Sequence, residues 1–142
     1  VAMILLFALA LGDVANLLAT GVYVAGLAEE TLPKGLLLPL LFLVSSVIAF
    51  SIGSSWGTFA IMIPLAMQIS ISLELDPAFF LAAVLSGSVF GDHASPISDT
   101  TVVASMASAT DHIDHVRTQL PYALIAATIA ALCFLVLGVI AL

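Results

Sequence analysis

Carboxylates and hydroxyl groups are concentrated in one short polar stretch, residues 91–101, between two apolar runs. Asp92 and Asp99 supply the carboxylates. The hydroxyl groups around them belong to Ser95, Ser98 and Thr100. Oxygen atoms of these kinds are the ligands that hard cations such as Na⁺ prefer, and desolvation favours the protonated form of a carboxyl group. The stretch therefore predicts a site at which Na⁺ and H⁺ compete for a carboxylate.

Pro96 predicts that the backbone opens inside this stretch. Proline has no backbone N–H and restricts the residue before it, so a helix that carries Asp92 is expected to open around Ser95 and to restart soon afterwards. Within a bilayer, such backbone is tolerated where it lines a cavity or is buried in protein, and its free carbonyl groups would be open to Na⁺. His93 is expected to tune the proton affinity of the site. In the alternative interpretation, Asp99 caps the restarting helix and Asp92 lies at a water interface.

A second polar interruption, residues 53–58, separates the apolar runs 36–52 and 59–71 and contains no charged residue. Its hydroxyl groups, which are predicted to supply further oxygen atoms to a cation, belong to Ser54, Ser55 and Thr58. Two interrupted segments in one half of a transporter point to a binding site near the membrane midplane. The two runs form either a re-entrant hairpin or a broken helix. A tight interfacial turn with Trp56 in the aromatic belt is the purely structural alternative.

The polar breaks belong to a chain with little other charge. Of its 142 residues, 63% are hydrophobic and 8% are charged, with a mean hydropathy of +1.30, against about 45–50% and about 25% in soluble domains. We therefore expect an all-α integral membrane protein with about four to six membrane elements, at roughly 20 residues for each spanning helix. The net charge of −7, with Lys34 and Arg117 as the basic residues, speaks against nucleic-acid binding and suits the handling of cations. The single Cys133 rules out an internal disulfide.

The first third of the chain predicts two short apolar pieces. Residues 1–11 and 17–28 are apolar, and Asp13 lies in the polar interruption between them. This carboxylate is expected either to cap the second piece or to face a transport path. Residues 29–35 and 74–77 predict surface loops, because charged residues and proline gather there.

A repeated Asp-His step occurs at residues 111–117. On a helix, His112 and His115 would lie on adjacent positions of one face. There they would be placed to bind a metal such as Zn²⁺, or to carry protons toward the site, because histidine titrates near neutrality.

A charged surface loop is a further interpretation of the same residues. In it, Arg117 pairs with Asp111 or with Asp114. Residues 119–142 then predict a complete spanning helix, long enough to cross with some tilt. The residues assigned a structural or gating role are Pro96, Trp56, Asp111 and Arg117.

Three motifs together resemble the C-terminal half of the NhaC-type sodium/proton antiporter family. The first is Ser-Ser-Trp-Gly-Thr-Phe-Ala-Ile-Met-Ile-Pro at residues 54–64. The second is Gly-Asp-His-Ala-Ser-Pro-Ile-Ser-Asp-Thr-Thr at residues 91–101, with Ala94 where such sequences commonly carry cysteine. The third is Asp-His-Ile-Asp-His-Val-Arg-Thr-Gln-Leu-Pro-Tyr at residues 111–122. The motifs follow the family's order, and the resemblance covers the whole chain.

The resemblance implies a multi-pass secondary transporter of the ion transporter superfamily, not an enzyme, in a bacterial or archaeal inner (cytoplasmic) membrane. Such transporters are built from two inverted repeats, so residues 1–142 are expected to form the C-terminal transmembrane domain of an antiporter. The chain begins at Val1 inside an apolar run, so we expect a fragment whose N-terminal repeat is missing.

The expected function is Na⁺/H⁺ antiport with Asp92 and Asp99 as the exchangeable carboxylates, and with no cofactor beyond the transported Na⁺ and H⁺. The expected partners are the lipid bilayer, the missing repeat and, in one arrangement, a second copy in a homo-oligomer. Relatives in the family also exchange organic anions such as malate and lactate. Na⁺-coupled organic-anion exchange and membrane metal binding are therefore the alternatives.

Overall fold

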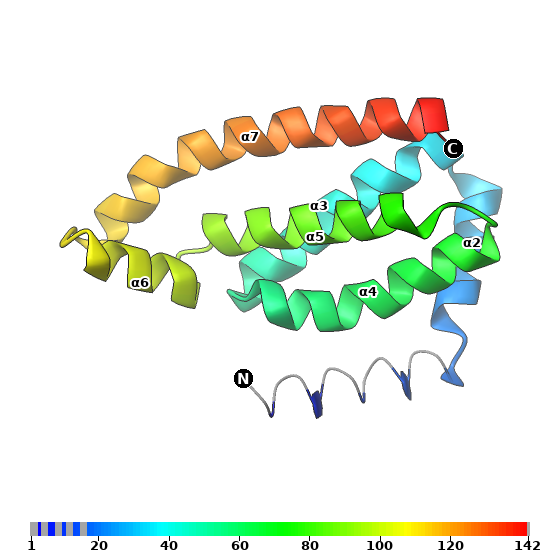
Figure 1. The fold of residues 1–142 in the computed structure, drawn as a ribbon, viewed down its shortest axis with the longest axis horizontal. Coiled ribbons are helices and arrows are strands. Elements are labelled where there is room, and N and C mark those ends of the chain that lie inside the picture. The colour runs from blue at the N-terminus through cyan, green and yellow to red at the C-terminus, as the bar shows by residue number, and fades with distance from the viewer. Residues whose placement is uncertain (1–2, 4–5, 8–9, 11–12, 15–16, 142) are drawn as a thin grey trace.

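All regular secondary structure in the described part of the chain is helical. A computed structural model describes residues 3, 6–7, 10, 13–14 and 17–141, and within these residues there are helices and no strands (Figure 1). The elements are α2 (Thr20–Thr31), the 3₁₀ helix η1 (Lys34–Leu36), α3 (Leu37–Ile52), α4 (Ser55–Ser72), α5 (Pro77–Ala94), α6 (Asp99–Ala107) and α7 (His112–Ala141). The expected all-α fold is confirmed.

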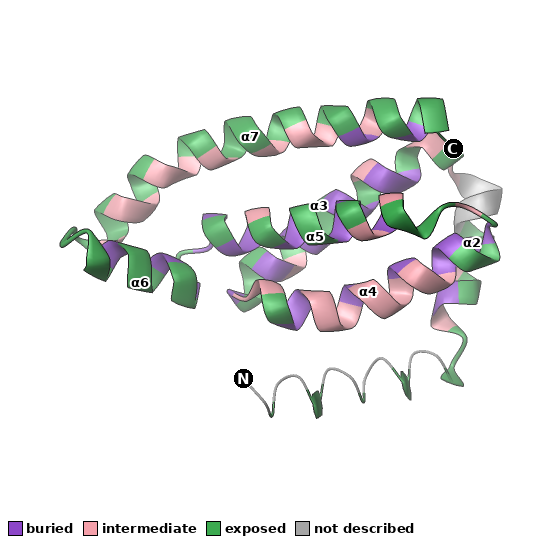
Figure 2. Cartoon of the chain, viewed as in Figure 1, coloured by how far each residue is buried: buried purple, intermediate pink, exposed green. Residues whose placement is uncertain are grey.

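Three units within the described residues are long and apolar enough to cross a membrane. They are Lys34–Ile52, Ser55–Ser72 and His112–Ala141. Helices α5 and α6 meet the same criterion as a pair, and they are bent by 52° at the break between them. Most of the surface of α7 is exposed (Figure 2) although the helix is strongly apolar, as expected of a helix that faces lipid. The pair has the length and composition of the predicted discontinuous or re-entrant segment.

Helices α3 and α4 form a hairpin that turns at Gly53. This glycine has a φ of 70°, in the left-handed region that commonly ends helices and that glycine adopts without a steric cost. Ser54 then caps α4, because its hydroxyl group accepts a hydrogen bond from the N–H of Gly57 at 3.4 Å. Figure 1 shows α4 running back from this turn toward α2. The apolar runs 36–52 and 59–71 are thus two helices of a hairpin rather than one broken helix.

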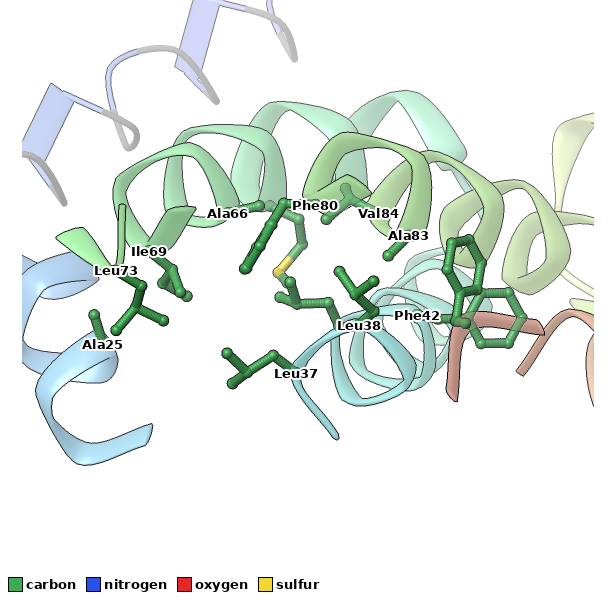
Figure 3. Packing of buried hydrophobic residues seen from close by; sticks show 13 residues of the cluster. Ala25, Leu37, Leu38, Phe42, Ala66, Ile69, Leu73, Phe80, Ala83 and Val84 are labelled. Atoms are coloured by element: carbon green, nitrogen blue, oxygen red, sulfur yellow. The ribbon is translucent and has the colours of Figure 1, made fainter. Parts of the chain in front are cut away.

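The apolar core lies between α3, α4 and α5, with α2 and α7 at its sides (Figure 3). Leu38 and Phe42 of α3 face Phe80 of α5 and Ala66 of α4, and all four are at most 1% exposed. The ring of Phe42 also lies 5.6 Å from the ring of Phe134 in α7, measured between centroids. Lipid tails are as apolar as these side chains, so close packing rather than exclusion of water holds the helices together.

The close approach of α3 and α5 depends on two glycines. A Cβ atom on Gly87 would collide with the carbonyl oxygen of Phe42, and one on Gly91 would collide with the carbonyl oxygen of Ser46. The two glycines are four residues apart, the spacing of small residues that lets membrane helices approach closely. They fix α5 against α3 immediately before Asp92.

The expectation that Asp13 caps the second apolar piece is wrong. Asp13 lies in helical backbone, and the chain turns at Leu18 and Ala19 instead, where Ala19 has a φ of 52°. Helix α2 starts only at Thr20, so Asp13 is too far along the chain to cap it. Its exposed side chain makes no hydrogen bond or ion pair to the described residues. Residues 12 and 16 of the expected interruption lie outside the described residues, and a role of Asp13 in a transport path stays a prediction.

The two predicted surface loops have different outcomes. The loop at 29–35 is shorter than expected, because α2 continues to Thr31 and η1 begins at Lys34. The loop at 74–77 is confirmed. Asp76 ends it by capping α5, since its side chain accepts a backbone hydrogen bond at 2.9 Å in the first turn of that helix.

The charged segment 111–117 is the start of α7 and not a surface loop. Asp111 caps the helix, because its Oδ1 atom accepts hydrogen bonds from the N–H groups of Ile113 at 2.9 Å and Asp114 at 3.3 Å. The helix continues from His112 through Pro121 into the apolar run without a break. The spanning helix expected at 119–142 therefore begins about two turns earlier than predicted.

Candidate ion-binding site

The two polar breaks lie against each other. Gly53 in the α3–α4 turn is so close to the α5–α6 break that a Cβ atom on it would lie 2.9 Å from the carbonyl oxygen of Ile97. Beside this contact, the hydroxyl group of Ser95 donates to the carbonyl oxygen of Phe50 at 2.7 Å, which joins positions 45 residues apart. Helix α5 ends just before Ser95, so the opening predicted from Pro96 is confirmed. The protein therefore has one polar centre rather than two.

Asp92 is the middle of this centre and is 3% exposed. The Oγ atom of Ser98 lies 2.6 Å from its Oδ1 atom. The Oγ1 atom of Thr100 lies 3.1 Å, and the Oγ atom of Ser55 lies 3.4 Å, from its Oδ2 atom. A buried carboxylate is costly unless it is hydrogen-bonded or neutralised, and these three hydroxyl groups surround it. The alternative that placed Asp92 at a water interface is wrong.

Two of these hydroxyl groups also contact each other. The Oγ atom of Ser98 and the Oγ1 atom of Thr100 are 2.7 Å apart, and either of them is able to donate. Ser98, Thr100 and the carboxylate of Asp92 therefore form a closed triangle of oxygen contacts. Ser55 approaches the triangle from the α3–α4 hairpin, at the start of α4.

The oxygen atoms are placed by helix ends. Asp92 lies in the last turn of α5, and Ser98 occupies the N-cap position of α6 with Thr100 in its first turn. Ser55 is the first residue of α4. Helix N-termini carry unpaired N–H groups and the positive end of the helix dipole, which stabilise a nearby negative charge. Two such ends, those of α4 and α6, meet at one carboxylate.

Asp99 lies outside this cluster. Its side chain is exposed, and its Oδ1 atom accepts the N–H of Thr100 at 2.9 Å. On one continuous helix it would share a face with Asp92, but the break between α5 and α6 separates the two carboxylates. The N-cap of α6 is Ser98, so the alternative that made Asp99 the cap is wrong as well. A part for Asp99 in ion exchange stays a prediction.

Three of the predicted oxygen donors use their hydroxyl groups elsewhere. Ser95 is bonded to the backbone of α3, as described above. Thr58 is fully buried and donates to the carbonyl oxygen of Ser54 at 3.0 Å, while the Ser54 hydroxyl group caps α4. The structure thus brings Ser55 to Asp92, and direct cation contacts by the other three hydroxyl groups stay predictions.

Trp56, beside Ser55, is 65% exposed and packs edge-on against Phe59, with ring centroids 5.9 Å apart.

His93 points away from the oxygen cluster. Its Nδ1 atom lies 3.0 Å from the carbonyl oxygen of Val89, and its own carbonyl oxygen accepts a hydrogen bond from Nε2 of Gln119 at 3.1 Å. The imidazole lines a largely apolar cavity of about 650 Å³ between α5 and α7, together with Tyr122. Within the described residues it makes no hydrogen bond to Asp92. Its expected role as a tuner of proton affinity stays a prediction.

The histidine that does reach the break is His112. Its ring contacts the carbonyl oxygen of Pro96 at 2.6 Å and the hydroxyl group of Ser105 at 3.2 Å. Arg117 is exposed and makes no ion pair with any described residue, so its expected pairing with an aspartate is not formed. In the part of the chain that the structure describes, no three His, Cys, Asp or Glu side chains gather to hold a metal ion. The alternative in which the Asp-His repeat forms a metal site is therefore not supported by these residues.

Sequence reasoning missed two features that position the site. The spacing of Gly87 and Gly91 is visible in the sequence and indicates close helix packing, but it does not identify the partner helix. The contact of His112 with the break carries no sequence signal, because the two positions are 16 residues apart and meet only through folding.

Comparison with known proteins gives consistent results. The family model described as "Na+/H+ antiporter family" matches residues 1–139. An uncharacterized protein of Haemophilus influenzae is 40% identical over 136 residues, which is 95% of this chain and 26% of that protein. The arginine/ornithine antiporter ArcD of Halobacterium salinarum is 38% identical over 79% of this chain and 23% of its own length. The malate-2H(+)/Na(+)-lactate antiporter of Bacillus subtilis is 38% identical over 70% of this chain and 22% of its own length.

The chain therefore spans about a quarter of the length of these curated relatives. No solved structure matches it significantly.

Proposed function

The chain belongs to the Na⁺/H⁺ antiporter family, and from this premise we propose that it takes part in Na⁺/H⁺ antiport with Asp92 as the carboxylate that exchanges the two ions. In this proposal the protein is a multi-pass membrane antiporter of the cytoplasmic membrane. In this proposal the chain works beside an N-terminal repeat of the same protein. Asp99 is retained as a second, outer carboxylate, through which cations reach the buried one.

The observation that carries the proposal is the oxygen triangle around Asp92. Its three contacts join Asp92 to Ser98 at 2.6 Å, Asp92 to Thr100 at 3.1 Å and Ser98 to Thr100 at 2.7 Å. Each contact requires one hydrogen atom, and each hydroxyl group supplies one. With an ionised carboxylate, the two hydroxyl groups leave one of the three contacts without a hydrogen. A proton on Asp92 completes the ring of hydrogen bonds.

The same oxygen atoms suit Na⁺ once that proton leaves. A hard cation binds carboxylate, hydroxyl and carbonyl oxygens, and all three kinds are present at this junction of two helix breaks. The positive charge of the ion replaces the positive charge of the proton, so the buried carboxylate stays neutralised in both states. One carboxylate with two hydroxyl groups thus supports mutually exclusive binding of H⁺ and Na⁺, which is the physical requirement of an antiporter.

The proposal is tested by Na⁺-driven proton movement in everted membrane vesicles that contain the full-length protein. The vesicles are energised until a trapped pH-sensitive dye is quenched, and Na⁺ is then added. We expect dequenching that saturates with Na⁺, and none with an equal concentration of choline. Asp92→Asn removes the exchangeable proton and is expected to abolish the response. A wild-type protein that gives no response to Na⁺, with or without other solutes, overturns the proposal.

A second candidate is Na⁺-coupled exchange of an organic anion. One relative is named a malate-2H(+)/Na(+)-lactate antiporter, and the cavity of about 650 Å³ beside the site is of the size that holds a small organic molecule. His93 and Gln119 line it and offer the polar groups that would orient such an anion. Dequenching that requires a carboxylate such as malate in addition to Na⁺ would favour this candidate over simple cation antiport.

A further inference from the structure

One histidine ties α7 to the break in the neighbouring span. The Nε2 atom of His112 lies 2.6 Å from the carbonyl oxygen of Pro96, in the segment between α5 and α6. Its Nδ1 atom lies 3.2 Å from the Oγ atom of Ser105 in α6. Both ring nitrogen atoms are therefore engaged with the interrupted span.

Hydrogen-bond chemistry fixes which nitrogen atom carries a hydrogen. A carbonyl oxygen only accepts, so the Nε2 atom of His112 must donate to Pro96. When the ring is neutral, the Nδ1 atom and the carbonyl oxygen of Val102, which lies 2.8 Å from the Ser105 hydroxyl group, compete for the one hydroxyl hydrogen. When the ring is charged, the Nδ1 atom donates to the hydroxyl oxygen. The bond to Pro96 is available in both states of the ring.

The carbonyl group of Pro96 needs such a donor. It lies where the helix is open, and an unpaired backbone carbonyl at membrane depth is costly. Gln119 serves the carbonyl group of His93 in the same way, at 3.1 Å. His112 and Gln119 are two turns apart on one face of α7. Side chains of this face therefore donate hydrogen bonds to two carbonyl groups, those of His93 and Pro96, at the end of α5 and in the break.

Pro96 is directly linked to the ion site. Ser98, two residues further on, contacts the carboxylate of Asp92 at 2.6 Å. On the other side of Pro96, Ser95 is bonded to the backbone of α3 at 2.7 Å. A shift of the Pro96 carbonyl would therefore be passed to the Ser98 hydroxyl group.

We propose that His112 is a positioning residue for the ion site: by holding the Pro96 carbonyl group, it fixes the Ser98 hydroxyl group against Asp92. His112 itself does not touch the ion. The inference deepens the proposed function and rests on it, since it assigns to α7 the task of holding the oxygen triangle in its binding geometry.

Two substitutions separate the two ring contacts. In His112→Gln, the amide nitrogen lies near the position of Nε2 and is able to donate to Pro96. In His112→Asn, the shorter side chain places its amide nitrogen near Nδ1 and loses Pro96. His115→Asn is the matched control, because His115 lies on the same helix and its side chain makes no hydrogen bond within the described residues.

Transport kinetics give the first test, in everted vesicles with equal amounts of each full-length variant in the membrane. We expect His112→Asn to raise the KM for Na⁺ by roughly 2- to 10-fold, the effect of losing one hydrogen bond, with a smaller change in kcat. His112→Gln is expected to restore the wild-type KM, and His115→Asn to leave it unchanged. Equal KM values for His112→Asn and wild type, or no rescue by glutamine, would overturn the inference.

Hydrogen–deuterium exchange of the protein in nanodiscs gives a second test that needs no transport. The amides of Ser95, Ile97 and Ser98 report on the break. His112→Asn is expected to speed their exchange, while His112→Gln and His115→Asn are not. If the wild-type protein fails to respond to Na⁺ but the exchange pattern holds, the positioning contact stands and the proposed function falls. If the break exchanges equally in all four proteins, the positioning contact is refuted whatever the transport result.

Discussion

The Oγ atom of Ser98 lies 2.6 Å from the Oδ1 atom of Asp92, although α5 ends between the two residues and Ser98 is the N-cap of α6. In a continuous helix, residues six positions apart lie on different faces, so this contact requires the break. At the break, where α5 and α6 are bent by 52°, Ser98 and Thr100 lie against Asp92 in the last turn of α5. The interruption is therefore what creates the site.

The two carboxylates are predicted to differ in importance. Asp92→Asn is expected to abolish Na⁺-driven proton movement, because the amide neither carries the exchangeable proton nor attracts the cation. Asp99→Asn is expected to lower the apparent Na⁺ affinity by less than about tenfold, since an exposed charge is screened by water and salt. Dye dequenching over a Na⁺ titration in everted vesicles measures both effects. An Asp99→Asn loss as complete as that of Asp92→Asn would show that the exposed residue belongs to the exchange site.

The hydroxyl groups of the triangle are predicted to act together. Hydrogen bonds to charged groups contribute about 1.5–3 kcal/mol, so Ser98→Ala and Thr100→Ala are each expected to weaken Na⁺ binding roughly tenfold or more. The double variant is expected to lose less than the sum of the two changes, because each hydroxyl group also bonds the other. A double-mutant cycle on the apparent KM for Na⁺ measures this coupling.

Thr128→Ala is the control for these variants, because the Thr128 hydroxyl group is exposed and bonds within α7 at 2.8 Å. It is expected to leave the KM unchanged. Strict additivity of Ser98→Ala and Thr100→Ala would contradict the triangle.

The glycine contact between α3 and α5 is predicted to control both stability and affinity. In Gly91→Ala the new Cβ atom meets the carbonyl oxygen of Ser46, and overpacking of this kind costs about 1–3 kcal/mol. A displaced α5 would also carry Asp92 away from Ser55. We expect a lower unfolding temperature in detergent and a raised KM for Na⁺.

Gly26→Ala is the matched glycine control, because a Cβ atom at Gly26 in α2 meets nothing within 4 Å. It is expected to be neutral or to stabilise α2 by up to about 1 kcal/mol through helix propensity. If Gly91→Ala and Gly26→Ala unfold alike, the close approach of α3 and α5 is not a determinant of stability.

Asp111 is predicted to have a structural role that is separable from transport. Loss of an N-cap costs about 1 kcal/mol, so Asp111→Ala is expected to lower the unfolding temperature while leaving the KM for Na⁺ nearly unchanged. Asp111→Asn keeps a capping oxygen and is expected to preserve stability. A large change in KM for Asp111→Asn would instead assign the negative charge itself to the transport path.

Local sequence patterns determined the secondary structure and the position of the break. The apolar runs, the loop capped by Asp76 and the opening at Ser95 before Pro96 all follow from residues close together in the chain. The family motifs likewise lie in continuous segments, and the family match over residues 1–139 confirms the resemblance they carry. Local signals failed in two places: Asp13 was expected to cap a helix, and the charged residues at the start of α7 were expected to form a loop. Both depend on the residue at which a helix begins, and the presence of a charged side chain does not determine that residue.

By itself, then, the sequence determined an all-helical membrane protein, the antiporter family and a polar break in a helix that carries carboxylates. Only the tertiary structure decided that Asp92, and not Asp99, is the enclosed carboxylate, that Ser55 reaches it from the start of α4, and that His112 contacts the break. These relations depend on how closely helices pack. That distance is set by small residues such as Gly91 against a partner helix, which no pattern along the chain identifies.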